Sequence, residues 1–181
     1  MRITRSVGVM ALLAMLVVPV SLGFAYGGAG GLTYGLQYAH PQLTNESIGL
    51  HTTGGYGYGT GRDGRRTGGF GLAIFSETNA LMGGVGGSIN GHEFVSGPLS
   101  LAVNLWTGIG GAKADLRDPG GYLIVFTELN AEVGLSLRPW MQLVAFGGMQ
   151  GIVNLVPGTP LYSAVYYSPV WGFRIAWGAF R

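Results

Sequence analysis

The chain has 181 residues, of which 10% are charged, 12% are aromatic and 35 are glycine, and it contains no cysteine. The lack of cysteine excludes disulfide bonds, thiol chemistry and a lipid anchor on an N-terminal cysteine. The small excess of 10 Lys and Arg over 8 Asp and Glu gives no electrostatic case for nucleic acid as a partner.

Residues 1–25 are predicted to be a cleaved export signal. A basic start with two arginines precedes an apolar stretch over residues 7–18, and a small-residue exit ends at Ala25. The stretch is shorter than the roughly 20 residues of a spanning helix, which disfavours a retained anchor. Cleavage removes 2 of the 10 basic residues, so 8 remain against 8 acidic ones. The mature chain, 26–181, is expected to be near neutral and to form one domain.

After the signal, hydrophobicity alternates with a period of two residues in eight segments separated by polar or glycine-rich breaks. The predicted strands are residues 30–39, 48–59, 69–76, 81–89, 99–109, 122–138, 141–153 and 170–181. The clearest alternation places Leu129, Val133 and Leu135 on one side of an extended chain and Glu128 and Glu132 on the other. On a helix, these apolar residues would be scattered around the axis and would form no buried stripe.

Two polar links are predicted as loops. Residues 60–67 are charged and rich in glycine, and a G-x-G-x-x-G pattern begins at Gly59. A dinucleotide-binding fingerprint needs a helix after it, and none is predicted, so a solvated hairpin loop is favoured. The arginines of this link could contact anionic head groups. Residues 90–97 form the second link and contain His92 and Glu93.

Two environments could hold the uncharged sides of these strands: the core of a secreted β-sandwich, or the hydrocarbon of a membrane. The 10% of charged residues is well below the roughly 25% of soluble domains, so too few charges exist to cover a water-exposed surface. The sequence therefore predicts an all-β fold, an antiparallel up-and-down transmembrane β-barrel of about eight strands. A soluble, ligand-binding sandwich is the alternative fold.

These features carry a resemblance to a known class. An exported chain of this length, with alternating segments and an aromatic-rich strand at its C-terminus, resembles the small eight-stranded bacterial outer-membrane barrel proteins. The resemblance covers most of residues 28–181, rests on pattern and composition, and identifies no subfamily. In that class the last residue is usually aromatic, whereas here Phe180 precedes Arg181. The resemblance implies the outer membrane of a diderm bacterium and contact with outer-membrane lipids.

The polar side of the strands would face the narrow lumen of such a barrel. Bare charges there cannot stay unpaired, because desolvation costs several kcal/mol for each ion. We therefore predict a structural polar network in which Glu128 or Glu132 pairs with Arg174. The predicted lumen network comprises Glu128, Glu132, Arg138, Arg174, Asn104 and Gln142.

Many aromatic residues are predicted to form belts at the two membrane interfaces. The belts are assigned to Tyr34, Tyr38, Trp140, Trp171 and Trp177, together with Tyr26, Tyr56, Tyr58, Tyr162, Tyr166 and Tyr167.

The sequence favours a structural or interaction role, exerted through the loops on the outside, with the lumen filled by side chains. One alternative is a lipid-modifying barrel enzyme that would pair His51 with Ser47 or His92 with Ser96. Surface or rim positions explain these histidines, and His40, more simply, so no catalytic residue, metal site or cofactor is assigned. A narrow solute channel is a further alternative. The sequence specifies neither the ligand or protein that the loops would contact nor the oligomeric state.

Overall fold

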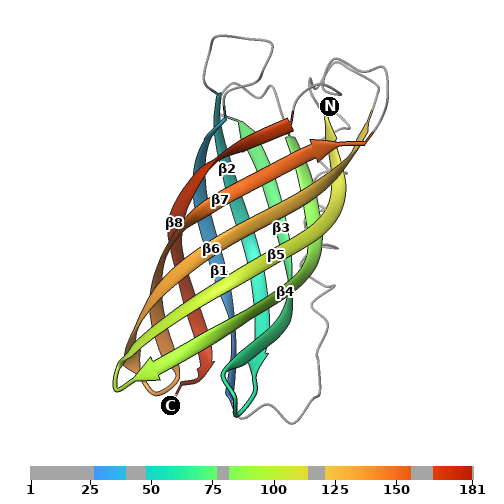
Figure 1. Ribbon diagram of the computed structural model, residues 1–181. Coiled ribbons are helices and arrows are strands. Elements are labelled where there is room, and N and C mark those ends of the chain that lie inside the picture. Colours follow the sequence, from blue (N-terminus) through green and yellow to red (C-terminus); the bar gives the residue numbers. More distant parts are fainter. Residues whose placement is uncertain (1–26, 40–47, 77–81, 114–120, 156–164, 181) are drawn as a thin grey trace, which may run out of the picture.

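Eight antiparallel strands close into a barrel in the computed structural model (Figure 1). The structure describes residues 27–39, 48–76, 82–113, 121–155 and 165–180. The strands are β1 (Gly27–Ala39), β2 (Ile48–Thr60), β3 (Arg65–Ser76), β4 (Met82–Ser96), β5 (Leu99–Lys113), β6 (Tyr122–Arg138), β7 (Met141–Asn154) and β8 (Val165–Ala179). Each predicted strand corresponds to one of these, so the all-β fold and the strand number are confirmed. The predicted signal, residues 1–25, lies outside the described residues.

The sheet has no open edge, because each strand pairs with the next and β8 pairs with β1. At the closing seam, Gly28 lies opposite Ala179 and Gln37 lies opposite Val170. The strand edges that could aggregate in an open sheet are therefore paired. Closure of one sheet into a ring also contradicts the alternative of a β-sandwich, which needs two stacked sheets. Among the described residues, no helix is long and apolar enough to cross a membrane.

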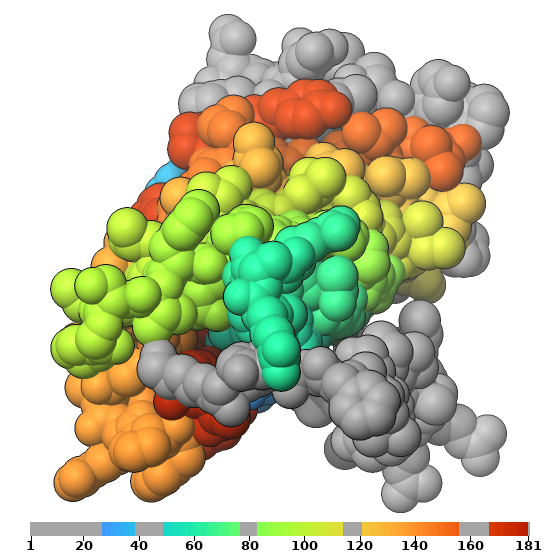
Figure 2. Space-filling view, turned by 60° about the horizontal axis from the view of Figure 1, so that its bottom comes forward, coloured from blue at the N-terminus to red at the C-terminus, as the bar shows by residue number. Residues whose placement is uncertain are grey.

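The two ends of the barrel differ in their connections. Three short turns, residues 61–64, 97–98 and 139–140, lie at the same end as Gly27 and Ala179 (Figure 1), and we call this the short-turn end. Figure 2, in which this end is turned forward, shows the β6–β7 turn in orange beside the C-terminal strand in red. The connections at the opposite end, residues 40–47, 77–81, 114–120 and 156–164, lie outside the described residues.

The link between β2 and β3 is shorter than the predicted loop over 60–67, because both strands extend into it. Gly64 has φ of 83°, in the left-handed region that glycine adopts most easily. The Oδ1 atom of Asp63 accepts a hydrogen bond from the backbone N–H of Arg65 at 3.1 Å. These local interactions close a tight turn, and strand β3 rather than a helix follows the G-x-G-x-x-G pattern.

Strand β4 continues through residues 90–96, so the prediction of a loop there was wrong. The glycine and polar residues there have low intrinsic preference for strands. Their backbones nevertheless pair with β5 as far as Ser96, which lies opposite Leu99. The neighbouring strand supplies the hydrogen-bond ladder, so tertiary pairing overrides the local preference. Strand β8 likewise begins at Val165, five positions before its predicted start at 170.

On β5 to β8, the outer face carries large apolar side chains. Leu129, Val133 and Leu135 are 56%, 54% and 45% exposed, while Glu128 and Glu132 are buried. Other exposed apolar or aromatic residues on these strands are Leu99, Leu101, Val103, Leu105, Ile109, Leu123, Leu137, Leu143, Met149, Tyr167, Trp171, Phe173 and Trp177. Along this half of the wall the outward-facing side chains are mostly apolar, and the buried charged side chains face the lumen.

Strands β2 to β4 show the reverse distribution of side-chain size. Their large apolar side chains are buried inside the barrel, and these are Leu50, Tyr56, Phe70, Leu72, Ile74, Val85 and Ile89. The positions between them, which face outward by alternation, are mostly small. They include Gly55, Gly57, Gly69, Gly71, Gly86 and Ser88. The outer apolar surface is therefore concentrated on β5 to β8.

Candidate functional site

Five ionisable side chains from four strands meet inside the barrel. Arg66 of β3 and Arg174 of β8 are 2% and 1% exposed, respectively. The two Nη atoms of Arg66 bind Glu93 at 2.5 Å and Glu132 at 2.7 Å. Arg174 binds Glu128 at 3.0 Å and also pairs with Glu132. The result is a continuous chain of ion pairs, Glu93–Arg66–Glu132–Arg174–Glu128, which we call the lumen network.

Neutral side chains satisfy further polar atoms of the lumen network. Asn130 donates a hydrogen bond from Nδ2 to Glu128 at 2.5 Å, and Asn104 donates to Asn130 at 3.2 Å. The Nε atom of Arg174 donates to the Thr33 hydroxyl at 3.2 Å. Such partners are needed because a buried charge repays its desolvation only when pairing and hydrogen bonds are both supplied.

Aromatic rings surround the two guanidinium groups. The guanidinium carbon of Arg174 lies 3.9 Å from the ring centre of Phe146 and 4.3 Å from that of Trp106. Arg66 lies 4.2 Å from the ring centre of Tyr58. Each arrangement is within the range of cation–π attraction. Phe146 fits beside Arg174 because Gly172 has no side chain. A Cβ at position 172 would lie only 2.7 Å from the Cζ atom of Phe146.

Toward the end opposite the short turns, apolar side chains fill the lumen. The rings of Phe70 and Trp106 pack with centroids 4.9 Å apart, and those of Phe70 and Phe126 with centroids 5.5 Å apart. Buried aliphatic residues of this half include Leu50, Leu72, Ile74, Val85, Ile124 and Ile152. Two amide side chains cross this region, with Gln150 Nε2 donating to Gln37 Oε1 at 2.8 Å. The lumen is therefore polar near the short turns and mainly apolar beyond them.

A cavity of about 470 Å³ opens at the short-turn end, below the lumen network. Its wall includes Glu93, Tyr58 and Gln142, and Gln142 donates hydrogen bonds to Ser100 at 2.9 Å and to Ser136 at 3.5 Å. The cavity gives solvent access to the Glu93 end of the network. Within the described ranges, no cluster of three or more His, Asp or Glu side chains is arranged to hold a metal ion.

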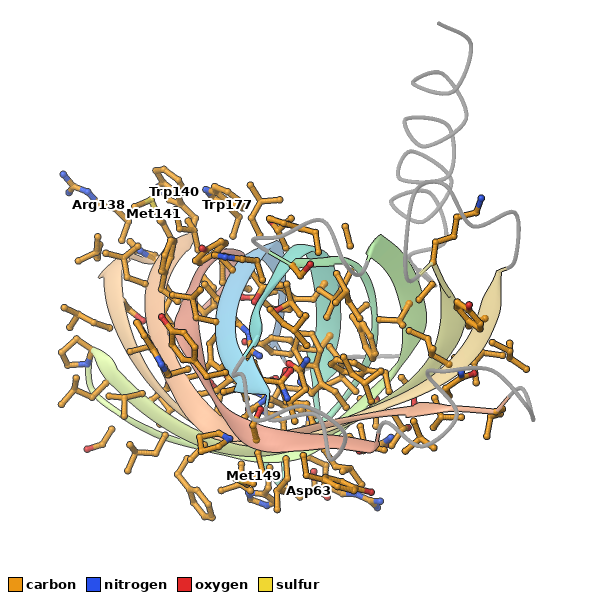
Figure 3. The ribbon with its side chains drawn as sticks, turned by 90° about the horizontal axis from the view of Figure 1, so that it is seen from above. Asp63, Arg138, Trp140, Met141, Met149 and Trp177 are labelled. Carbon is orange, nitrogen blue, oxygen red and sulfur yellow. The ribbon has the colours of Figure 1, made fainter. Side chains whose placement is uncertain are left out.

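The structure brings most of the sequence-predicted lumen residues together. Glu128, Glu132, Arg174, Asn104 and Gln142 are all buried inside the barrel. Arg138 is exposed, so its assignment to the lumen was wrong. The register of β6 against β7 shifts between Ser136 and Arg138, and this bulge turns the arginine to the outer face. In Figure 3 the side chain of Arg138 points away from the ring of strands.

The predicted belt aromatics divide into two groups. Tyr38, Trp140, Trp171 and Trp177 are 52%, 57%, 55% and 43% exposed, and Tyr34 is partly buried on the outer face of β1.

Tyr56 and Tyr58 point into the barrel, so their assignment to an interface belt was wrong. Tyr56 contacts Trp106 at 5.8 Å between ring centroids, and Tyr58 contacts Arg66. Tyr26 and Tyr162 lie outside the described residues.

Sequence reasoning missed Arg66 and Glu93, because both fell in segments predicted as loops. The alternation of inward-facing and outward-facing residues could have identified both. Arg66 is an even number of positions from the buried Phe70, and Glu93 stands in the same relation to the buried Ile89. Continuing the alternation of each strand into the predicted loop would have placed both charged side chains on the inner face.

The histidines proposed for catalysis are placed as follows. The Tyr34 hydroxyl lies 2.7 Å from Nδ1 of His51, whose ring stacks on Phe75 with an interplanar angle of 8°. His92 and Ser96 are four residues apart on β4, a separation of roughly 13 Å in an extended strand, which prevents a direct hydrogen bond between them. Ser47 and His40 lie outside the described residues.

No family model matches the sequence, and no curated protein matches it. Among solved structures, the barrel is similar to the crystal structure of Neisserial surface protein A, with a TM-score of 0.64. The alignment has 11% sequence identity and covers 84% of this chain and 96% of that chain. At this identity the similarity shows the fold alone. The resemblance to small eight-stranded barrels therefore holds for the fold.

We expect strong energetic coupling between Arg174 and Glu132. Arg174→Ala leaves the buried Glu128 without a cation, and Glu132→Ala removes the carboxylate that Arg66 and Arg174 share. Each single change should therefore destabilise the folded barrel by about 3–5 kcal/mol. The double variant should lose at least about 1 kcal/mol less than the sum of the single losses. Urea unfolding of the refolded protein in detergent measures all four free energies. The matched control replaces the exposed Arg65, instead of Arg174, with alanine. The losses of unfolding free energy in Arg65→Ala and Glu132→Ala should be additive. Additive losses for the Arg174–Glu132 pair would contradict the assignment.

Proposed function

We propose that this chain is an exported outer-membrane barrel protein of a diderm bacterium with a structural or interaction role. The supporting observation is the continuous apolar outer surface of β5 to β8, where large side chains are 41–65% exposed. An apolar surface of this extent is unusual on a soluble monomer, whereas acyl chains require it. Residues 1–25 would serve as the cleaved export signal, consistent with their composition.

The orientation follows from the connections. In outer-membrane barrels the short turns face the periplasm and the longer connections face outside. The three turns at the short-turn end would then be periplasmic. The four connections at the other end, of which the longest is residues 155–164 between β7 and β8, would contact an extracellular ligand or protein.

The filled lumen supports an interaction role over solute passage. Rings of Phe70, Trp106 and Phe126 pack across one half of the lumen, and the lumen network occupies the other half. An eight-stranded barrel has an interior just wide enough for its own side chains. This protein would therefore present a rigid, closed scaffold from which the outside connections extend.

Cell fractionation tests the proposed location. The protein should pellet with outer membranes, resist extraction by sodium carbonate, and dissolve in detergent. The folded barrel should also migrate faster than the boiled chain on a gel, because the closed sheet resists dodecyl sulfate at room temperature. A protein that stays monodisperse in buffer without detergent would contradict the proposal.

The contact with the bilayer is tested by placing an arginine on the outer face at two depths and comparing the losses of stability. Leu105→Arg, near the middle of β5, should destabilise the protein by about 2–4 kcal/mol in lipid vesicles, since charge is costly at the bilayer midplane. The matched control is Leu135→Arg, near the short-turn end of β6, where the cost should fall to about 0–1 kcal/mol. The two leucines are equally exposed, at 45% each, so a soluble protein would show similar effects for both. Denaturant unfolding of both variants in vesicles gives the comparison.

Planar-bilayer recordings test the closed lumen. The wild-type protein should show no steady ionic current, because packed side chains occupy the lumen. Arg174→Ala should also remain closed, since the apolar half of the lumen is unchanged. Stable single-channel steps from the wild type would instead favour the alternative of a narrow solute channel.

A further inference from the structure

The bulge in β6 changes which face of the barrel receives Arg138. Ser136 lies opposite Gln142, whose side chain is buried in the lumen, whereas Arg138 lies opposite Met141. The extra residue shifts the phase of the strand by one position, so Arg138 shares the outer face with Met141. The arginine thus leaves the lumen network and joins the outer surface at the short-turn end.

Two exposed tryptophans accompany Arg138 there. Met141 lies opposite Arg138 on one side and opposite Trp177 on the other, so Arg138 and Trp177 flank Met141 across three adjacent strands. Trp140 precedes Met141 in the turn. Figure 3 shows the labelled side chains of Arg138, Trp140, Met141 and Trp177 together on one side of the ring.

The backbone under these side chains is fixed. The N–H of Gly178 donates to the carbonyl of Trp140 at 3.1 Å, and that of Phe180 donates to the carbonyl of Pro139 at 3.2 Å. These bonds tie the β6–β7 turn to the end of β8. The two tryptophans are therefore presented from a braced turn and a paired strand.

Arg138 has no internal counter-charge in the part of the chain that the structure describes. Arg66 and Arg174 hold the carboxylates of the lumen network, and no described carboxylate contacts Arg138. A guanidinium group offers a planar fork of donors that matches a phosphate group. Indole rings favour the interface between acyl chains and water. An anion held at the edge of the apolar surface would meet both requirements.

We propose that Arg138, Trp140 and Trp177 form a binding site for the phosphate of an anionic phospholipid in the leaflet at the short-turn end. This inference rests on the proposed membrane location. Arg138 binds the phosphate, and the two indoles border the headgroup. Met141 and Leu143, on the same outer face of β7, contact the first segment of the acyl chains.

Bromine quenching of tryptophan fluorescence tests the site. The folded full chain carrying Trp171→Phe is reconstituted in phosphatidylcholine vesicles that contain increasing fractions of phosphatidylglycerol with brominated acyl chains. Trp106 is 1% exposed inside the barrel and supplies a constant background, so quenching reports on Trp140 and Trp177. The measured quantity is the binding constant of phosphatidylglycerol relative to phosphatidylcholine.

Arg138→Gln should lower this relative constant about fivefold, the size expected for one exposed charge-assisted contact. Arg65→Gln is the matched control, because Arg65 is exposed at the same end and lies opposite His92 rather than beside the two tryptophans. The control should keep the wild-type constant. Unchanged gel mobility of the unboiled variants shows that both are folded.

Three results would overturn the site. These are a wild-type constant retained by Arg138→Gln, an equal loss in Arg65→Gln, or loss of the lipid preference when inorganic phosphate replaces chloride at equal ionic strength. The last would indicate a site for free phosphate rather than for lipid. Failure of the wild-type chain to insert into vesicles would instead contradict the proposed membrane location, so the two failures are distinguishable.

Discussion

Charges inside a narrow barrel must be neutralised by one another, and this constraint organises the interior. Five ionisable groups from β3, β4, β6 and β8 are distant in sequence but form one chain of ion pairs. Removing Arg66 leaves Glu93 without a cation, and removing Arg174 leaves Glu128 without one. The desolvation penalty of the stranded carboxylate then exceeds the net value of the lost ion pair. The lumen network therefore specifies how the strands align around the ring. A one-residue slip of β6 would turn Glu128 and Glu132 outward and replace them with Leu129 and Val133.

The same constraint explains why the wall is uneven. Arg174 is surrounded by Phe146 and Trp106, and large rings need space inside the barrel. That space comes from inward-facing glycines such as Gly172, and bulky residues on the inner face of β2 and β3 fill other parts of the lumen. Those two strands consequently have little side-chain volume on the outside. The apolar outer surface and the filled lumen are two results of distributing one set of side chains between the faces of a single sheet.

The sequence predicts the strand number, the closed antiparallel fold and the inward direction of Glu128, Glu132 and Arg174. The strand number and the fold follow from eight alternating segments with few charges, and the inward direction of the charges follows from strands whose charged residues alternate with large apolar ones. It does not predict the faces of Tyr56 and Tyr58, because glycine alternates with aromatic residues there and neither face carries a charge that would require the lumen. It also misplaces Arg66 and Glu93, since polar and glycine-rich segments resemble loops until a neighbouring strand supplies the hydrogen bonds.

Arg138 shows why alternation alone cannot assign a strand end. Without the bulge its side chain would enter the lumen beside the cavity at the short-turn end. The lumen would then contain three guanidinium groups and three carboxylates. The register shift prevents this and leaves Arg66 and Arg174 with Glu93, Glu128 and Glu132 in the described interior. The remaining negative charge is stabilised by amide donors, since Asn130 donates to Glu128 at 2.5 Å. Moving Arg138 outward therefore costs the lumen network little, because hydrogen bonds replace the missing cation. It also supplies the outer surface with a positive charge beside the strand that separates it from Trp177. One inserted residue thus separates the part of β6 that stabilises the interior from the part that contacts the surroundings of the barrel.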